Sequence, residues 1–290
     1  MGFFSPGVQN WQKRALPLFG PNIERGLFFG QTAKGSWRPL WRAPPGSPIT
    51  KAVRGDSGPG PGPDHFPRGA HNPSRGLGPR SPPGPAGALL VQPASPGPTA
   101  AVLLLHGGRA EGMEPPPLVN LPALRMRPFV AAATSALDGR RVLVGEVRYR
   151  RRGWNGDRRD PAKDAQTALD ILRERAGPLP VVLIGHSMGG RAALRAGGDP
   201  MVRGVIALAP WLPAGEPVAH LAGRRIYVLH DPADRVTAAS DSWAFVHRAA
   251  AAGAEAAAIP MAVGGHTMLR SASTWHQRVA QLTAGLLADD

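Results

Sequence analysis

One serine in this chain is flanked by residues that suit it for nucleophilic chemistry. Ser187 lies at the centre of Gly-His-Ser-Met-Gly, residues 185–189. Four β-prone apolar residues at 181–184 lead into this motif, and a run compatible with a helix, residues 191–196, follows it. A strand, a tight turn and a helix in this order hold a serine hydroxyl above the edge of a sheet, and the glycines leave room where a Cβ would collide. We therefore predict that Ser187 is a nucleophile.

A serine hydroxyl is a poor nucleophile at neutral pH unless an imidazole accepts its proton and an acid orients that imidazole. Two later loops supply both groups, each directly behind a predicted strand. Asp231 and Asp234 follow a strand expected at residues 226–229. His266 follows a strand expected at residues 257–263, within a Gly-Gly-His sequence. His266 is thus the predicted base, and on the residues alone either aspartate can be the acid.

The segments that must position these residues alternate between strand-like and helix-like patterns. Residues 100–105 form a continuous apolar run, typical of a strand buried on both faces of a parallel sheet. Asp160 and Pro161 predict a helix start, as an N-cap acceptor and a proline at the first helical position, and Gly177 ends that helix. Further strands are expected at 88–91, 141–147 and 202–208, and further helices from 121 or 128 to 137, at 240–252 and at 268–287. This alternation predicts an α/β fold, a mostly parallel sheet sandwiched by helices with right-handed crossovers.

The composition divides the 290 residues into two regions. Nineteen of the 33 prolines lie in the first 99 residues, where runs of glycine and proline leave no apolar periodicity. Such a segment cannot bury enough surface to offset its ordering entropy, so we predict that residues 1–86 are a disordered tail rich in proline, glycine and arginine. Residues 87–290 are long enough for one sizeable core and are the predicted folded domain.

Charge, cysteine content and hydropathy narrow the classes of function. The net charge is +14, and the first 95 residues hold eleven basic against three acidic residues. No nucleic-acid recognition motif accompanies this charge, so we interpret the basic tail as solvated and predict no specific nucleic-acid partner. The chain has no cysteine, which rules out disulfides and thiolate metal ligands. Without a secretory signal core or an apolar run of about 18 residues, we expect a soluble, cytoplasmic protein with no membrane insertion.

Taken together, these motifs resemble those of the α/β-hydrolase family over about residues 88–287. The resemblance rests on four segments: Leu-His-Gly-Gly at 105–108, Gly-His-Ser-Met-Gly-Gly at 185–190, Asp-Pro-Ala-Asp-Arg-Val at 231–236 and Gly-Gly-His at 264–266. It implies a catalytic triad of Ser187, Asp234 and His266, since the family acid usually precedes an arginine and an aliphatic residue. Asp231 is the runner-up for the acid.

The resemblance also implies how a developing negative charge is stabilised. An oxyanion hole needs two backbone N–H groups directed at the same oxygen. The family supplies one from the residue after the nucleophile, here Met188, and one from the loop after the His-Gly pair, here Gly108 or Arg109. His106 and His186 occupy motif positions that we interpret as structural.

The lengths and compositions of two loops bear on the substrate. Residues 209–224 are too few for the large helical lid of many family members, so we expect an open pocket partly roofed by the loop at 109–127. Trp154 and Trp211 are the expected pocket walls. The loop after residue 147 carries four arginines that could bind an anionic group, although we favour a solvated loop: Arg148, Arg150, Arg151 and Arg152.

These observations predict a serine hydrolase that cleaves small or medium carboxylic esters through an acyl-enzyme intermediate. Its partner is a small-molecule ester, no metal or organic cofactor is implied, and the sequence makes no prediction about the oligomeric state. Three alternatives stay open. The chain could be a serine peptidase or a lysophospholipase of the same fold, a non-catalytic binding scaffold, or a nucleic-acid-associated protein that uses its basic tail.

Overall fold

The computed structural model describes residues 97–117, 119–137 and 139–288, together with the backbone of three short strands nearer the N-terminus. The chain divides into two units, Met1–Pro82 and Pro83–Asp290. In the first unit β1 (Phe29–Gln31) and β2 (Trp37–Pro39) pair antiparallel, which was not predicted. Apart from these strands, the predicted disordered tail at residues 1–86 lies outside the described residues.

The second unit is built on one sheet, which has seven strands in the described part of the chain. The sheet order is β3-β5-β4-β6-β7-β8-β9, with β3 antiparallel to β5 and every other neighbour parallel. The strands are β3 (Leu89–Val91), β4 (Ala100–Leu105), β5 (Val142–Val147), β6 (Val181–His186), β7 (Val202–Leu208), β8 (Arg225–His230) and β9 (Glu255–Pro260). The mostly parallel sheet predicted from the alternating pattern is confirmed.

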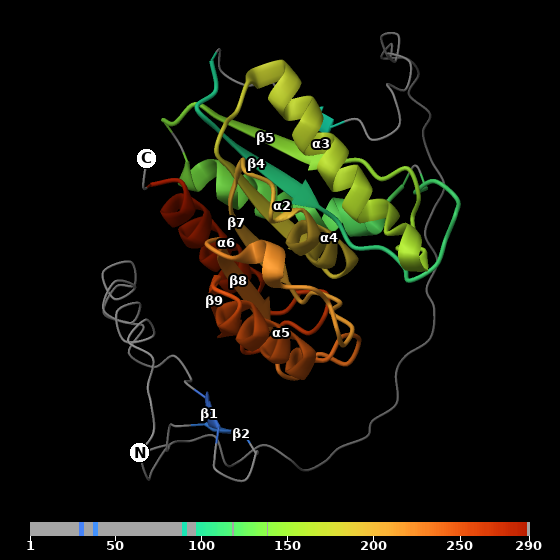
Figure 1. Ribbon diagram of the computed structural model, residues 1–290, viewed down its shortest axis with the longest axis vertical. Coiled ribbons are helices and arrows are strands. Elements are labelled where there is room, and N and C mark those ends of the chain that lie inside the picture. Colours follow the sequence, from blue (N-terminus) through green and yellow to red (C-terminus); the bar gives the residue numbers. More distant parts are fainter. Residues whose placement is uncertain are drawn as a thin grey trace, which may run out of the picture. The chain divides into compact units, whose positions relative to one another are not determined.

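Helices cover both faces of this sheet (Figure 1). The helices α2 (Leu121–Ala136) and α6 (Ala272–Leu286) pack against each other on one face. On the other face lie α3 (Asp160–Ala176), α4 (Met188–Ala196) and α5 (Ala239–Ala251). The three-layer arrangement of an α/β fold is therefore confirmed, with β6 and α4, the elements on either side of Ser187, near its centre.

The side chains of the central strands alternate between two cores. In β4, Leu103 and Leu105 pack in the core under α3, α4 and α5, whereas Val102 and Leu104 pack in the core under α2 and α6. All four are buried. A strand with both faces covered needs apolar residues at every position, which explains the uninterrupted apolar runs in the sequence.

The chain around His266 departs from the predicted elements. β9 spans Glu255–Pro260 rather than residues 257–263, and α6 begins at Ala272 rather than at residue 268. The residues between them form a loop in which Val263, Met268 and Ser271 have positive φ angles of 56°, 55° and 50°. A left-handed backbone continues neither a strand nor a right-handed helix, so the loop is longer than its apolar residues suggest.

The start of α3 also differs in detail from the prediction. Asp160 is the first helical residue and not the N-cap, which is Arg159 with φ 50°. The Asp160 carboxylate accepts hydrogen bonds from Asn155 Nδ2 at 2.8 Å and Arg158 Nε at 3.0 Å. It therefore fastens the preceding loop to the helix instead of capping the helix N–H groups.

Candidate active site

Ser187 lies in a strained turn between β6 and α4. Its backbone has φ 53° and ψ −118°, a conformation that costs a residue with a side chain about 1–3 kcal/mol. The turn leaves no room for side chains on its glycines. A Cβ on Gly185 would lie 2.3 Å from the carbonyl oxygen of Gly189, and one on Gly189 would lie 2.3 Å from that of Leu105. The glycines of the motif are thus required by the close approach of three backbone segments.

Three side chains from three different loops form one hydrogen-bonded chain. Ser187 Oγ is 3.0 Å from His266 Nε2, and His266 Nδ1 is 2.9 Å from Asp234 Oδ2. The residues follow β6, β9 and β8, three parallel strands whose carboxyl ends meet at one edge of the sheet. The structure therefore brings together the three residues that the sequence singles out for nucleophile, base and acid.

The Asp234 carboxylate is fully buried and is held by backbone as well as side-chain donors. Its Oδ1 accepts the N–H groups of Val236 at 2.7 Å and Thr237 at 3.3 Å. Burial alone would raise the pKa of Asp234, but the Val236 N–H and the hydrogen bond to His266 outweigh it and lower the pKa below its ordinary value. Asp234 is consequently ionised at neutral pH and can stabilise a protonated His266.

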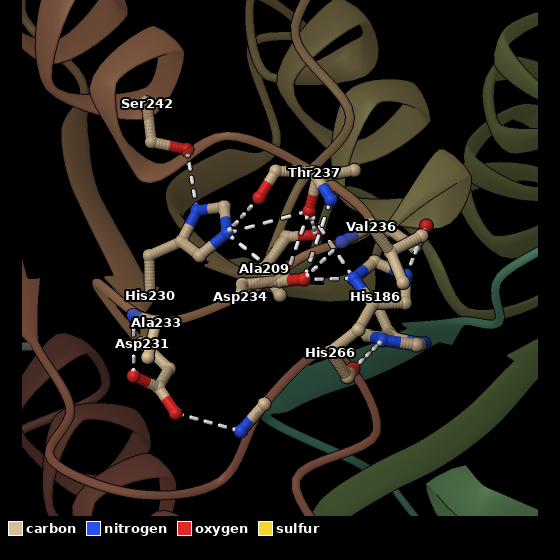
Figure 2. A network of polar contacts seen from close by, with 12 residues as sticks. His186, Ala209, His230, Asp231, Ala233, Asp234, Val236, Thr237, Ser242 and His266 are labelled. Atoms are coloured by element: carbon tan, nitrogen blue, oxygen red, sulfur yellow. Dashed lines mark hydrogen bonds and ion pairs between the residues drawn. The ribbon is translucent and has the colours of Figure 1, made fainter.

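Asp231, the runner-up for the acid, has a different set of contacts. Its Oδ2 accepts the N–H of Gly265 at 2.7 Å, and its Oδ1 accepts the N–H of Ala233 at 2.8 Å (Figure 2). The side chain thus ties the loop after β8 to the loop that carries His266. Asp234, and not Asp231, is the aspartate in hydrogen-bond contact with the imidazole of His266.

The N–H groups considered for an oxyanion hole differ in whether they are already used. Met188 is the first residue of α4, and the first N–H groups of a helix have no acceptor within it. The Arg109 N–H donates to the carbonyl oxygen of Arg152 at 3.2 Å. Within residues 97–117, 119–137 and 139–288, the Gly108 N–H has no hydrogen-bond acceptor. The geometry therefore favours Gly108 over Arg109 as the second donor.

The two motif histidines contact backbone atoms of the site. His186 is buried, its Nε2–H donates to the carbonyl oxygen of His266 at 2.8 Å, and burial lowers its pKa to about 3, so the ring is neutral. His106 donates from Nδ1 to the carbonyl oxygen of Gly107 at 2.7 Å and accepts at Nε2 from Asn120 at 3.2 Å. Both sets of contacts fit the structural interpretation of these residues.

The expected pocket walls are part of a packed cluster. Trp154 is only 2% exposed and lies in the core, with its ring 6.3 Å from that of Trp211 in an edge-to-face arrangement. The Arg191 guanidinium lies 3.9 Å from the Trp154 ring centroid and 4.7 Å from that of Trp211. Trp154 is therefore covered by protein, and its position does not support the prediction that it forms a wall of an open pocket.

Most of the arginine loop is also held by the protein. Three of its four arginines have internal partners, whereas Arg148 is exposed. These partners are Asp164 for Arg150, the carbonyl oxygen of Met113 for Arg151 and Glu114 for Arg152. Two of the three contacts fasten the arginine loop to the loop at 109–127, so the cluster is largely structural and not a free anion site.

Sequence reasoning missed two residues that contact the acid, His230 and Thr237, and a third, Ser242, that contacts His230. His230 Nε2 lies 3.1 Å from Asp234 Oδ2, and its Nδ1 lies 2.8 Å from Ser242 Oγ. The Thr237 hydroxyl is also 3.1 Å from Asp234 Oδ2. The signal for His230 was a polar residue at the end of an apolar strand, four residues before Asp234. The contact of Ser242 depends on how α5 packs, which no local pattern reveals.

Comparison with known proteins places this chain in a family. A family model described as the alpha/beta hydrolase family matches residues 102–290, and the chain belongs to that family. No curated protein matches the sequence. Among the described residues, no group of histidine, aspartate and glutamate side chains is arranged to hold a metal ion, and no helix is long and apolar enough to cross a membrane.

Several solved structures share the fold at low sequence identity. MGS-M1, an alpha/beta hydrolase enzyme from a Medee basin deep-sea metagenome library, superposes with a TM-score of 0.54 and 16% identity, over 69% of this chain and 93% of that one. A thermophilic esterase of Thermogutta terrifontis, with butyrate bound, superposes with a TM-score of 0.52 and 18% identity, over 69% of this chain and 88% of that one. Est1E of Butyrivibrio proteoclasticus, with ferulic acid bound, superposes with a TM-score of 0.51 and 12% identity, over 70% of this chain and 96% of that one.

Proposed function

We propose that this protein is a serine hydrolase that cleaves small or medium carboxylic esters through an acyl-enzyme intermediate. The observation that carries the proposal is the unbroken hydrogen-bonded chain from Ser187 Oγ through His266 to a buried, ionised Asp234. Ser187 also has the strained backbone that projects a nucleophile from the end of a central strand. Membership of the α/β hydrolase family agrees with this assignment.

In the first half of the reaction, Ser187 Oγ attacks the ester carbonyl carbon while His266 Nε2 takes the hydroxyl proton. Asp234 stabilises the resulting imidazolium, and the N–H groups of Met188 and Gly108 bind the negative oxygen of the tetrahedral intermediate. His266 then donates the proton to the leaving alkoxide, which departs as the alcohol. A water molecule repeats the sequence on the acyl-enzyme, releases the acid and restores the Ser187 hydroxyl.

The surface around the triad supports a substrate with apolar groups. In the described part of the chain, the large apolar side chains that are exposed all lie on three segments: the loop and helix start at 113–124, the loop of Asp234 and the loop of His266. They are Met113, Val119, Leu121, Leu124, Val236, Val263 and Leu269. Val236 lies two residues after Asp234, and Val263 and Leu269 each lie three residues from His266. The first segment contacts His106 through Asn120 at 3.2 Å. Exposed apolar side chains on the loops that carry the triad favour contact with an apolar ligand.

The loop after β7 bears on substrate size. Residues 209–224 contain one short element, the 3₁₀ helix η5 (Ala219–Leu221), so this segment forms no large cap. The short segment is consistent with small or medium ester substrates. Butyrate in the Thermogutta terrifontis esterase is a small acid, and ferulic acid in Est1E is a medium-sized aromatic acid.

The test measures hydrolysis of p-nitrophenyl esters from acetate to octanoate by the full chain and by Ser187→Ala, with His247→Asn, an exposed histidine of α5, as a control. We expect turnover by the full chain and the control, loss in Ser187→Ala, and a preference for short acyl groups. Labelling by a fluorophosphonate should depend on Ser187. If no ester is cleaved and the probe does not label Ser187, the proposed function is wrong.

A further inference from the structure

We propose that His230 is a positioning residue that holds the Asp234 carboxylate and shares its Oδ2 atom with His266. The proposal deepens the proposed function and rests on it, since it assigns the second histidine of the site a part in the same reaction. It starts from an arrangement visible in Figure 2, where the ring of His230 lies between Ser242 on one side and Asp234 on the other.

The position of His230 is set by the core. It is the last residue of β8, and its side chain is completely buried. Nδ1 lies 2.8 Å from Ser242 Oγ on α5, and Nε2 lies 3.1 Å from Asp234 Oδ2. The Trp243 ring packs edge-on with its centroid 6.0 Å from that of His230. Strand, helix and aromatic ring together leave the imidazole one orientation.

The neighbouring atoms decide which nitrogen of His230 carries the proton. Nε2 faces the carboxylate oxygen of Asp234 and, at 3.2 Å, the carbonyl oxygen of Thr237, and neither atom can donate a hydrogen bond. The Thr237 hydroxyl, at 3.3 Å, could donate to Nε2, but it also lies 3.1 Å from Asp234 Oδ2, where it donates to the charged oxygen. An ionised carboxylate and a carbonyl oxygen beside Nε2 therefore favour the hydrogen on Nε2. Nδ1 is left as an acceptor, and the Ser242 hydroxyl, which can rotate, is the donor to it. The contact with Ser242 is thus compatible with the tautomer in which His230 donates to Asp234.

The consequence for the acid is a carboxylate that cannot turn. Oδ2 is contacted by His266 Nδ1 at 2.9 Å, His230 Nε2 at 3.1 Å and the Thr237 hydroxyl at 3.1 Å. Oδ1 accepts the two backbone N–H groups described above. A carboxylate has about four lone-pair sites, so these five donors saturate it. Rotation about the Cβ–Cγ bond would break several contacts at once, and Oδ2 therefore stays directed at His266.

The shared oxygen also tunes the charge that His266 experiences. A neutral donor on Oδ2 draws negative charge from the atom that must stabilise the imidazolium. If that donor is removed, Asp234 holds the protonated form of His266 more strongly. Because His266 must be unprotonated to accept the Ser187 proton, activity would then be lost at a higher pH than in the natural protein.

The other charged and titratable groups of this region are few. Asp234 and His266 act on His230, and burial lowers the pKa of His230, which keeps the ring neutral at neutral pH. On the far side of His266 lies His186, on which Arg125 also acts. Asp231 belongs to the same loop as Asp234. On α5, the facing residues are Ser242 and Trp243, which do not titrate in the range of interest.

The first measurement is independent of catalysis. Two-bond ¹⁵N–¹H correlation spectra of the labelled full chain report the protonation of each histidine nitrogen, and the His230 signals are those missing from the spectrum of His230→Gln. At pH 7 we expect a neutral ring with hydrogen on Nε2. A ring with hydrogen on Nδ1, or on both nitrogens, would overturn the proposal, whether or not an ester is cleaved.

The second measurement separates positioning from packing with two variants. In His230→Gln the amide nitrogen reaches the place of Nε2 and can donate to Asp234. In His230→Asn the side chain reaches only the place of Nδ1, so the contact with Ser242 can persist while the one with Asp234 is lost. His247→Asn on the exposed side of α5 is the matched control.

We expect His230→Asn to lower kcat about 10- to 100-fold with little change in KM, by analogy with the loss found when the hydrogen-bond partner of a metal-ligating side chain is removed. The acid limb of its pH–rate profile should move to higher pH. His230→Gln should lose less and keep the limb in place. Equal losses in both variants with an unmoved limb would show that His230 only packs. If the natural chain neither cleaves esters nor is labelled by a fluorophosphonate, the proposed function is wrong. The NMR spectra would then be the test of the hydrogen bond between His230 and Asp234.

Discussion

Two buried carboxylates, Glu216 and Asp234, are held by different kinds of partner. Glu216 is 2% exposed and pairs with Arg191 Nε at 2.8 Å and with Arg195 Nε. The Asp234 side chain is also buried, but its hydrogen-bond partners include the imidazoles of His230 and His266. Arginine is charged at every accessible pH, whereas a buried histidine can be neutral. The first arrangement can only hold structure together, and the second can also transfer protons.

The surroundings of the two clusters agree with this division. The Arg191 guanidinium lies against the rings of Trp154 and Trp211. Arg248 donates to the Glu216 carbonyl oxygen at 2.9 Å, so the Glu216 cluster ties α4 and α5 to the loop after β7. The Asp234 cluster instead ends at the exposed edge of the sheet, at Ser187 Oγ. Mutations that remove one charge from each cluster should therefore have different effects.

The largest effect is expected from Asp234→Asn. The asparagine amide cannot stabilise a protonated imidazole and favours the wrong tautomer of His266, so kcat/KM should fall about 10⁴-fold. The fold should persist, because a neutral side chain of the same shape replaces a buried charge. Steady-state ester hydrolysis and urea unfolding measure the two quantities, with Asp241→Asn, on the exposed side of α5, as control. If activity falls only in proportion to the loss of folded protein, Asp234 would be a structural residue like Glu216.

The matching change in the other cluster is Glu216→Gln, which should act on stability. It leaves Arg191 and Arg195 without their buried counter-charge, and breaking a buried ion pair in this way costs about 3–5 kcal/mol in the free energy of unfolding. Below the unfolding transition, activity per folded molecule should stay close to that of the natural chain. Glu174→Gln, an exposed glutamate of α3, should change neither quantity. A selective loss of kcat in Glu216→Gln would mean that this cluster takes part in catalysis.

The same contrast marks what could be predicted from the sequence. The strands were predictable because burial on both faces requires continuous apolar runs, as in β4, and Ser187 because its turn requires glycines at fixed spacing. The end of β9 was not, since Met261 and Val263 are apolar like the strand before them, although Val263 has a positive φ. Except for His266, the partners of the two carboxylates were missed because they are set by packing. Glu216 and Arg191 are 25 residues apart in the sequence, and His230 reaches Asp234 only through the turn of the loop.

A smaller effect should distinguish the clusters by pH. His186 donates a hydrogen bond to the carbonyl oxygen of His266 and is therefore connected to the Asp234 cluster. Burial lowers the pKa of His186 to about 3. In the unfolded chain a histidine has a pKa near 6.5, so between pH 6.5 and about 3 the unfolded state binds a proton that the folded state excludes. Stability therefore falls as the pH falls, by about 1.4 kcal/mol per pH unit from this residue within the window.

His186→Gln removes that titration while its amide can still donate to the His266 carbonyl oxygen. Between pH 6 and pH 4, its free energy of unfolding should decline less steeply than that of the natural chain, by about 1.4 kcal/mol per pH unit. Gln281→Ala, at an exposed position of α6, should decline like the natural chain, because neither side chain titrates. Urea unfolding at four pH values gives the slopes. Identical slopes for all three proteins would mean that the titration of His186 does not contribute to the loss of stability in acid.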